Sequence, residues 1–497
     1  MILTLLVIIP LLGGLLSFYL GKISPMLPRW AALSALSVDF ILLLILWIKP
    51  DAIISTQGGQ WIAEVNLEWI PQLGINFHLA MDGLNFLLTL LTVFLGITAV
   101  ASSWTEIRER IGFFHLNLLA VLSGIIGTFL SLDLFIFYFF WELMLIPMYF
   151  LIAIWGHEDR FYASIKFFIF TQASGLIMLV AILGLYFIHG KNTGAYTFDY
   201  TQLLGTTLSP AAEMWLMLGF LIAFAVKLPV IPIHTWLPDA HTEAPTAGSV
   251  ILAGLLLKTG AYGMIRFIIP LFPHASSVIA PVIFTLAAAG ILYGALVAFG
   301  QTDLKRLIAY TSVSHMGFVL LGVFMFNDIA LKGAVLQMLC HGVSTGALFI
   351  IAGALQERMH TREMARMGGL WATTPRIGAV MLFFALASLG LPGLGNFIAE
   401  FLVLLGSFGA NKTVASIASV GLILAMSYSL WMMQRVFHGP NEFNWSLADF
   451  KTREMAVMAA MVAIILWLGV YPQPVLDRLG NMQTGPQSLS ASVKETR

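Results

Sequence analysis

The chain has only one cysteine and few charged residues in its 497 positions. Because Cys340, which lies in an apolar run, is the single cysteine, it cannot form a disulfide within the chain or hold an iron–sulfur cluster alone. Charged residues make up 10% of the chain, whereas a soluble domain carries roughly 25%. Lysine plus arginine and aspartate plus glutamate each number 25, so nothing indicates a nucleic-acid partner. The composition excludes an ordinary soluble domain, and no glycine-rich nucleotide motif follows a strand.

What the chain does have is long apolar runs, which recur from one end to the other. Hydrophobic residues make up 59%, and a run of about 20 such residues spans a bilayer as a helix. Fourteen spans are expected at residues 2–20, 30–48, 83–103, 112–131, 133–154, 164–188, 212–232, 246–268, 277–299, 304–324, 329–354, 377–408, 415–437 and 455–473. The first run lacks a preceding basic region and is too long for a signal-peptide core, so it is read as a retained span. We therefore predict an all-α polytopic membrane protein, with residues 1–497 as one integral membrane domain.

Loop charges predict the orientation. If the N-terminus faces outward, the inner loops hold about 15 lysines and arginines and the outer segments about 8. Both termini are therefore expected on the periplasmic side.

Two of the spans contain helix breakers. Pro229 stands two residues after Lys227 in the seventh span, and Pro392 stands two residues after Gly390 in the twelfth. A proline within a span removes a helical hydrogen bond, which lipid tolerates only where protein or water covers the freed groups. Broken helices at matching positions of two inverted halves are typical of transport sites. We predict inverted five-helix repeats at residues 112–268 (spans 4–8) and 277–437 (spans 9–13).

Three ionisable residues stand in the middle of predicted spans: Glu142, Lys227 and Lys258. A charge at this depth costs ~2.5–3.5 kcal/mol on insertion scales, so such residues are rare without a function. The alternatives are a neutral carboxyl that donates a hydrogen bond, and lysines that extend to the membrane interface. Because these positions lie far from any loop, we favour a proton pathway.

Polar residues also line two neighbouring spans. At helical spacing, residues 304–324 and 329–354 each present one polar stripe, comprising Thr311, Ser312 and His315, and Gln337, His341, Ser344 and Thr345. The alternative is a set of hydrogen bonds that hold helices together, but two adjacent stripes with histidines favour a hydrated proton path. No acidic or cysteine ligands complete a zinc site.

Glu400 follows the break at Pro392 and is either a neutral carboxyl or the acidic exit of the path. The interval 234–246 collects His234, Asp239, His241 and Glu243, and a solvated loop is an equal alternative there.

Two long motifs carry a family resemblance. KLPVIPIHTWLPDAHTEAPTAGSVILAGLLLKTGAYGMIRF (227–267) and TDLKRLIAYTSVSHMGFVLLG (302–322) resemble signatures of the antiporter-like subunits of respiratory complex I, the NADH–quinone oxidoreductase, and of their Mrp antiporter relatives. FWELMLIPMYFLIAIWGHE (140–158) and HTREMARMGGLW (360–371) support the complex I side. The resemblance covers essentially the whole chain.

The resemblance implies fourteen helices with two inverted repeats and a proton-translocating function. It matches Glu142 and Lys227 to a charge pair, Lys258 to the central lysine, and Glu400 to the acid on the broken twelfth span. His315 and His341 match relay residues. NADH, FMN, iron–sulfur clusters and quinone are expected in other subunits, with no cofactor in this chain.

The same resemblance implies partners and a location. The expected partners are other membrane-arm subunits, including neighbouring antiporter-like subunits, and the lipid bilayer of the bacterial inner membrane. The alternatives are an Mrp-type Na⁺/H⁺ antiporter subunit, a hydrogenase-linked ion-pumping subunit, and a purely structural spacer. Intact charges in the bilayer interior argue against the spacer.

Overall fold

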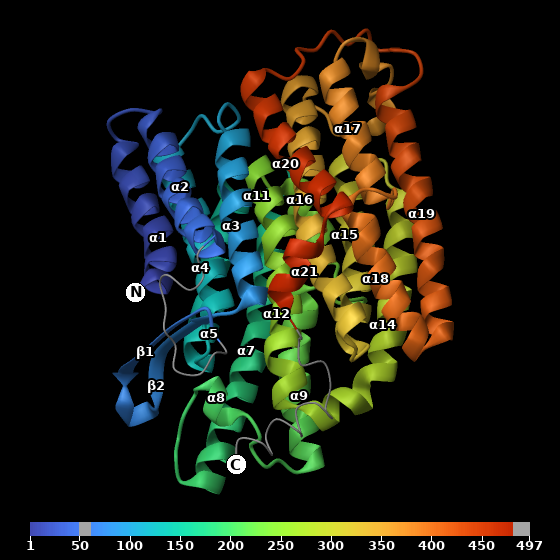
Figure 1. Ribbon diagram of the computed structural model, residues 1–497. Helices are drawn as coiled ribbons and strands as arrows, with labels where there is room; N and C mark the ends of the chain where they lie inside the picture. The colour runs from blue at the N-terminus through green and yellow to red at the C-terminus, as the bar shows by residue number, and fades with distance from the viewer. Residues whose placement is uncertain (49–60, 481–497) are drawn as a thin grey trace.

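Long helices lie side by side and form most of the protein. The computed structural model describes residues 1–48 and 61–480 (Figure 1). Thirteen spans in this part of the chain are long and apolar enough to cross a membrane. They are α1 (Ile2–Leu20), α2 (Leu27–Ile48), α3 (Gly83–Ser102), α4 (Ile111–Leu130), α5 (Leu134–Leu143) continued by α6 (Leu145–Trp155), α7 (Arg160–Thr193), α9 (Pro210–Lys227), the segment Thr246–Leu271, α14 (Pro273–Phe299), α15 (Leu304–Phe324), α16 (Asp328–Met359), α19 (Lys412–Phe437) and α20 (Thr452–Val470).

The remaining predicted span consists of two shorter helices, α17 (Pro375–Ser388) and α18 (Gly395–Ala410). Every predicted span therefore coincides with helix, and the predicted class, an all-α polytopic membrane protein, is confirmed. The inverted relation between residues 112–268 and 277–437 stays a prediction.

A small β hairpin was not predicted. Strands β1 (Ala63–Ile70) and β2 (Ile75–Met81) pair antiparallel, at the end of the bundle where α1 begins (Figure 1). His78 fixes the hairpin to the bundle, because its Nδ1 lies 2.6 Å from Asp199 Oδ2. Its Nε2 lies 2.9 Å from Glu64 Oε1 within the hairpin. Asp199 caps the short helix α8 (Tyr200–Leu203), so the hairpin is joined to the loop after α7.

The seventh span is interrupted after Lys227, and the chain then continues in a second short helix. The predicted end at residue 232 was wrong, because α9 ends at Lys227 and α10 (Trp236–Glu243), which is almost wholly buried, follows the break. The Trp236 indole donates to the Val226 carbonyl at 2.9 Å and so covers a backbone group that the break leaves free. The interval 234–246 is therefore packed protein, and of the two equal alternatives for it the solvated loop is excluded.

The twelfth span is interrupted between Ser388, where α17 ends, and Gly395, where α18 begins. Gly390 has φ of 79° and Gly393 has φ of 94°, both in the left-handed region. Residues with side chains rarely adopt this conformation, so the two glycines allow the sharp turn on either side of Pro392.

The segment that carries Lys258 departs from regular α-helix. It runs through α11 (Thr246–Ile251), the π-helical turn η3 (Leu252–Leu256), α12 (Leu257–Gly263), the π turn η4 (Met264–Ile268) and α13 (Ile269–Leu271). Single π turns within helices occur frequently at functional sites. A Cβ on Gly260 would lie 2.5 Å from the Phe224 carbonyl oxygen, so α12 packs directly against the end of α9.

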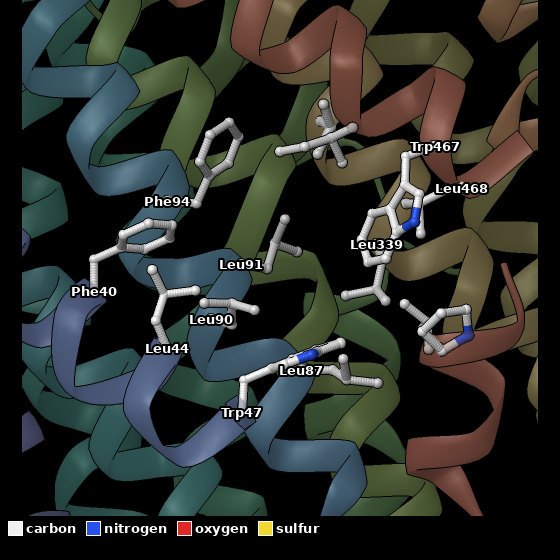
Figure 2. A pocket seen from close by; sticks show the side chains of 14 residues that line it. Phe40, Leu44, Trp47, Leu87, Leu90, Leu91, Phe94, Leu339, Trp467 and Leu468 are labelled. Atoms are coloured by element: carbon white, nitrogen blue, oxygen red, sulfur yellow. The ribbon is translucent and has the colours of Figure 1, made fainter. Parts of the chain in front are cut away.

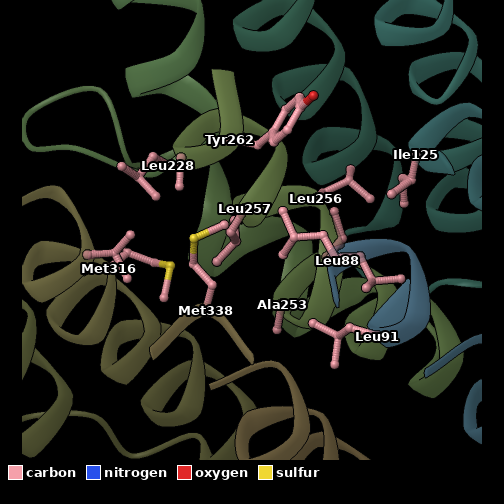
Figure 3. Packing of buried hydrophobic residues seen from close by; sticks show 14 of the residues in the cluster. Leu88, Leu91, Ile125, Leu228, Ala253, Leu256, Leu257, Tyr262, Met316 and Met338 are labelled. Atoms are coloured by element: carbon pink, nitrogen blue, oxygen red, sulfur yellow. The ribbon is translucent and has the colours of Figure 1, made fainter. Parts of the chain in front are cut away.

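Apolar side chains surround these helices on several sides. An apolar cavity of about 480 Å³ lies between α2, α3, α16 and α20 (Figure 2). Deeper in the bundle, Leu228, Leu257, Met316 and Met338 lie close together beside α12 (Figure 3). Polar groups at this depth therefore stand in a low-dielectric surrounding, where an unsatisfied polar group is costly.

Candidate functional site

Lys258 and His341 make the central contact of the buried polar groups. Lys258 Nζ, with a fully buried side chain, lies 2.7 Å from His341 Nδ1. The ammonium also donates to the carbonyl of Ala253 in the π turn η3. On its other side His341 Nε2 lies 3.1 Å from the Ser312 hydroxyl. A histidine with both nitrogens engaged in this way can accept a proton on one and release it from the other.

A second group forms around His315 on α15. His315 Nδ1 lies 2.8 Å from Glu400 Oε1 on α18, and His315 Nε2 lies 3.1 Å from the hydroxyl of Ser388. The Gln337 amide donates to the same Glu400 oxygen at 2.9 Å. His315 and Glu400 are 2% and 1% exposed, so the pair is shielded from solvent. Ser388 is the last residue of α17, so the break in span 12 places both of its halves against His315.

The two groups are joined through the histidines. The ring centroids of His315 and His341 are 5.6 Å apart. Ser312 and His315 share one face of α15 through i,i+3 spacing, and Gln337 and His341 share one face of α16 through i,i+4 spacing. Four predicted residues, Lys258, His341, His315 and Glu400, therefore lie in one continuous buried line.

Glu142 and Lys227 lie apart from this line. Lys227, 1% exposed, holds its ammonium 5.0 Å from the Trp141 ring centroid and 5.8 Å from that of Phe167. Its Nζ has no hydrogen-bond partner among the described residues. Glu142 is half-buried, and its Oε1 lies against α7, where a Cβ on Gly175 would approach it to 2.4 Å.

Glu142 and Lys227 do not form the expected close ion pair in the described part of the chain, although the two groups influence each other electrostatically. The physical reason is packing, because the indole of Trp141 occupies one side of the ammonium. Lys227 is also close to the central lysine's helix, since a Cβ on Gly260 of α12 would lie 3.2 Å from Lys227 Cβ.

A polar cavity of about 1060 Å³ opens at the end of the bundle opposite the β hairpin and is lined by residues that include Glu106, His157 and Arg362. At its inner side the buried Lys305 reaches the Ala244 carbonyl at 3.2 Å and lies 3.4 Å from His157 Nε2. Burial, together with the charges of Lys305 and two arginines, lowers the pKa of His157 to about 3, so this ring is neutral and only weakly basic. Burial raises the pKa of the Glu106 carboxyl.

His241 of α10 stands between this cavity and the central lysine. It lies within electrostatic range of both Lys258 and Lys305. Its ring stacks on Phe349 with centroids 4.6 Å apart, and both nitrogens lack partners among the described residues. The sequence predicted no role for Lys305, which was counted among the loop charges, or for Glu106 and His157. His241 was placed in an interval that could equally be a solvated loop.

Metal-ligating side chains do not cluster in the described part of the chain. No group of three histidine, cysteine, aspartate or glutamate side chains is arranged there to hold a metal ion. Cys340 is buried and unpaired. The arrangement of lysines, histidines and a carboxyl is suited to moving protons among fixed side chains.

A multi-pass helical bundle with two interrupted helices and a buried line of titratable groups defines the class of antiporter-like membrane proteins. The family model described as NADH:quinone oxidoreductase/Mrp antiporter, TM, matches residues 131–466. The chain belongs to this family, as its motifs predicted.

Individual relatives agree. The chain is 54% identical over 486 residues to NADH-quinone oxidoreductase subunit M of Pseudomonas aeruginosa, covering 96% of each chain. It matches a chain of respiratory complex I from Thermus thermophilus with bound NADH at 32% identity and a TM-score of 0.87, covering 98% of this chain and 100% of that one. A chain of the Mrp complex from Dietzia sp. DQ12-45-1b, 22% identical with a TM-score of 0.85 and 98% of each chain covered, shares the fold.

Proposed function

We propose that this chain is a proton-translocating membrane-arm subunit of a bacterial NADH–quinone oxidoreductase. The continuous buried line from Lys258 through His341 and His315 to Glu400 is the observation that carries the proposal. Identities of 54% and 32% to complex I proteins, against 22% to the Mrp chain, favour this function over Na⁺/H⁺ antiport.

The proposed path begins at the polar cavity on the cytoplasmic side. A proton passes from the Glu106 and Lys305 region to His241 and then to Lys258 in the centre of the bundle. From Lys258 it moves to His341, then along the line to Glu400, and leaves toward the periplasm. Groups in hydrogen-bond contact exchange the proton directly, and a bridging water carries it across the wider steps of the proposed path.

Glu142 and Lys227 would control the affinity of Lys258 for its proton. Lys227 stands at the end of α9, directly against α12, and its ammonium has no hydrogen-bond partner among the described residues. A change in the charge of Glu142 alters Lys227, and in a low dielectric Lys227 acts strongly on Lys258. The signal that changes Glu142 comes from neighbouring subunits.

The redox chemistry belongs to other subunits in this proposal. NADH, FMN, iron–sulfur clusters and quinone bind elsewhere in the complex, and the neighbouring antiporter-like subunits are direct partners. The chain lies in the bacterial inner membrane with both termini in the periplasm, as the loop charges predict.

The test is proton pumping by vesicles that carry the assembled complex with Lys258→Met. We expect pumping driven by NADH to be lost, while uncoupled NADH oxidation by the peripheral arm persists. The matched control is Lys332→Met, on α16, whose ammonium pairs with Asp328 at 2.6 Å outside the buried line. Normal pumping in Lys258→Met, with assembly shown, would reject the proposal.

The control role of the charge pair has its own test. Glu142→Ala and Lys227→Ala should each lower pumping in the assembled complex, since each removes one of the two interacting charges. If both variants pump at the wild-type rate with normal electron transfer, the pair has no such role.

A further inference from the structure

The cavity between α2, α3, α16 and α20 has the character of a hydrocarbon site (Figure 2). Its volume of about 480 Å³ lies within the range of ~300–1,000 Å³ common for ligand pockets. Leu87, Leu91 and Val343 form a buried floor, whereas Leu44 and Trp467 on the rim are 39% and 41% exposed. An apolar cavity of this kind does not hold ordered water and binds apolar molecules instead.

A cationic group stands at one end of this cavity. Pro474 and Val475 of α21 (Gln473–Leu479) line that end, and Arg478 of the same helix reaches Trp47 on the rim. The Arg478 guanidinium donates to the Trp47 carbonyl oxygen and lies 5.1 Å from the centroid of its ring. Arg478 takes part in none of the ion pairs formed by the described residues. Within the described part of the chain its charge therefore has no acidic partner.

We propose that this cavity binds one acyl chain of an anionic phospholipid, whose phosphate group meets Arg478. The exposed rim lets a chain come in from the surrounding bilayer, and the leucine-rich floor offers it only hydrocarbon contacts. Trp47 and Trp467, whose ring centroids are 6.4 Å apart, flank the opening, and tryptophan is the residue enriched at headgroup depth. Since Arg478 follows the last span, it lies at the end of the bundle where α1 begins, and a headgroup of that leaflet would stand there.

The position of the cavity gives the lipid a consequence, which rests on the proposed function. Leu339 and Val343 of the lining flank His341 on α16, and a Cβ on Gly342 would lie 2.9 Å from Leu91. The cavity therefore backs directly onto the helix that carries the proton relay. An acyl chain in the cavity would exclude water from the side of α16 that lies behind His341.

The experiment uses the assembled complex in vesicles doped with phosphatidylglycerol that carries a photoreactive group on its acyl chain. We expect crosslinks in α3 and α16 of wild-type protein, and their loss in Leu44→Trp, whose larger side chain fills the opening. Leu176→Trp, on α7 with 49% exposure and outside the cavity lining, should leave them unchanged.

The headgroup contact has a separate readout that does not depend on the folding of Leu44→Trp. Arg478→Gln should reduce the preference for phosphatidylglycerol over photoreactive phosphatidylcholine by about fivefold, the value of one basic residue near a membrane surface. Arg478→Lys should retain most of the preference because it keeps the charge.

Three results would overturn the proposal. They are crosslinks confined to the exposed helix faces, equal labelling by the two lipids in the wild type, and labelling of the cavity by a photoreactive quinone tail that displaces the phospholipid. None of these readouts measures pumping, so the proposal and the proposed function can fail independently.

Discussion

His341→Leu is the most informative single change in the relay. His341 holds Lys258 Nζ at 2.7 Å on one side and the Ser312 hydroxyl at 3.1 Å on the other. Its ring is also the link to His315, at 5.6 Å between centroids. A leucine side chain fits the apolar surroundings but can neither accept nor donate a proton. The line from Lys258 to Glu400 would be cut at one point.

The size of the effect follows from the contact that is lost. A hydrogen bond to a charged group contributes ~1.5–3 kcal/mol. That free energy, added to the barrier for proton transfer from Lys258, slows the step by about 10- to 160-fold. We therefore expect pumping to fall by at least about tenfold, because no other hydrogen bond of the described residues joins the Lys258 ammonium to a side chain on another helix.

The assay is NADH-driven acidification of vesicles that contain the assembled complex, with NADH oxidation measured separately in the presence of an uncoupler. The control is His189→Leu, which removes a buried histidine on α7 that contacts Thr206 at 2.8 Å, outside the relay. Pumping by His341→Leu at the wild-type rate, or an equal loss in both variants, would refute the reasoning.

Two further predictions rest on contacts seen only in the structure. Gly175→Ala places a methyl group 2.4 Å from Glu142 Oε1, so the carboxyl must move and proton pumping should fall. The control Gly290→Ala, whose new methyl group meets no atom within 4 Å, should leave pumping unchanged. Equal pumping rates in the two variants would contradict the prediction. Burial lowers the pKa of His78, but the hydrogen bond and charge of Asp199 outweigh it and the net shift is upward. The hairpin is then held in full below about pH 6.5 and loosens as the pH rises through the shifted pKa. Hydrogen exchange in β1 and β2, corrected for its intrinsic pH dependence, should show this, and His78→Gln should abolish it.

The spans could be predicted from the sequence because the bilayer demands a long apolar run for each crossing. Glu142, Lys227 and Lys258 stood out for the same reason, since a charge in such a run is rare. Which of these groups touch could not be predicted. The rotation of each helix decides that Lys258 meets His341 while Lys227 meets Trp141.

Other features carried no usable signal. The π turns around Lys258 depend on the packing of a wholly buried segment, and their composition resembles that of any apolar helix. α10 was hidden because its polar residues suggested a solvated loop, although tertiary contacts bury it. Lys305 was read as a loop charge because it lies at the start of its helix, yet it is 1% exposed and contacts His157, which lines the polar cavity.

The most direct measurement is the number of protons pumped per NADH by Lys258→Met, His341→Leu and the double variant. Groups that act as one relay lose function together, so the double variant should lose no more than the worse single variant. Losses that multiply in the double variant would show that Lys258 and His341 act on separate paths, and would contradict the continuous buried line as the route of the proton.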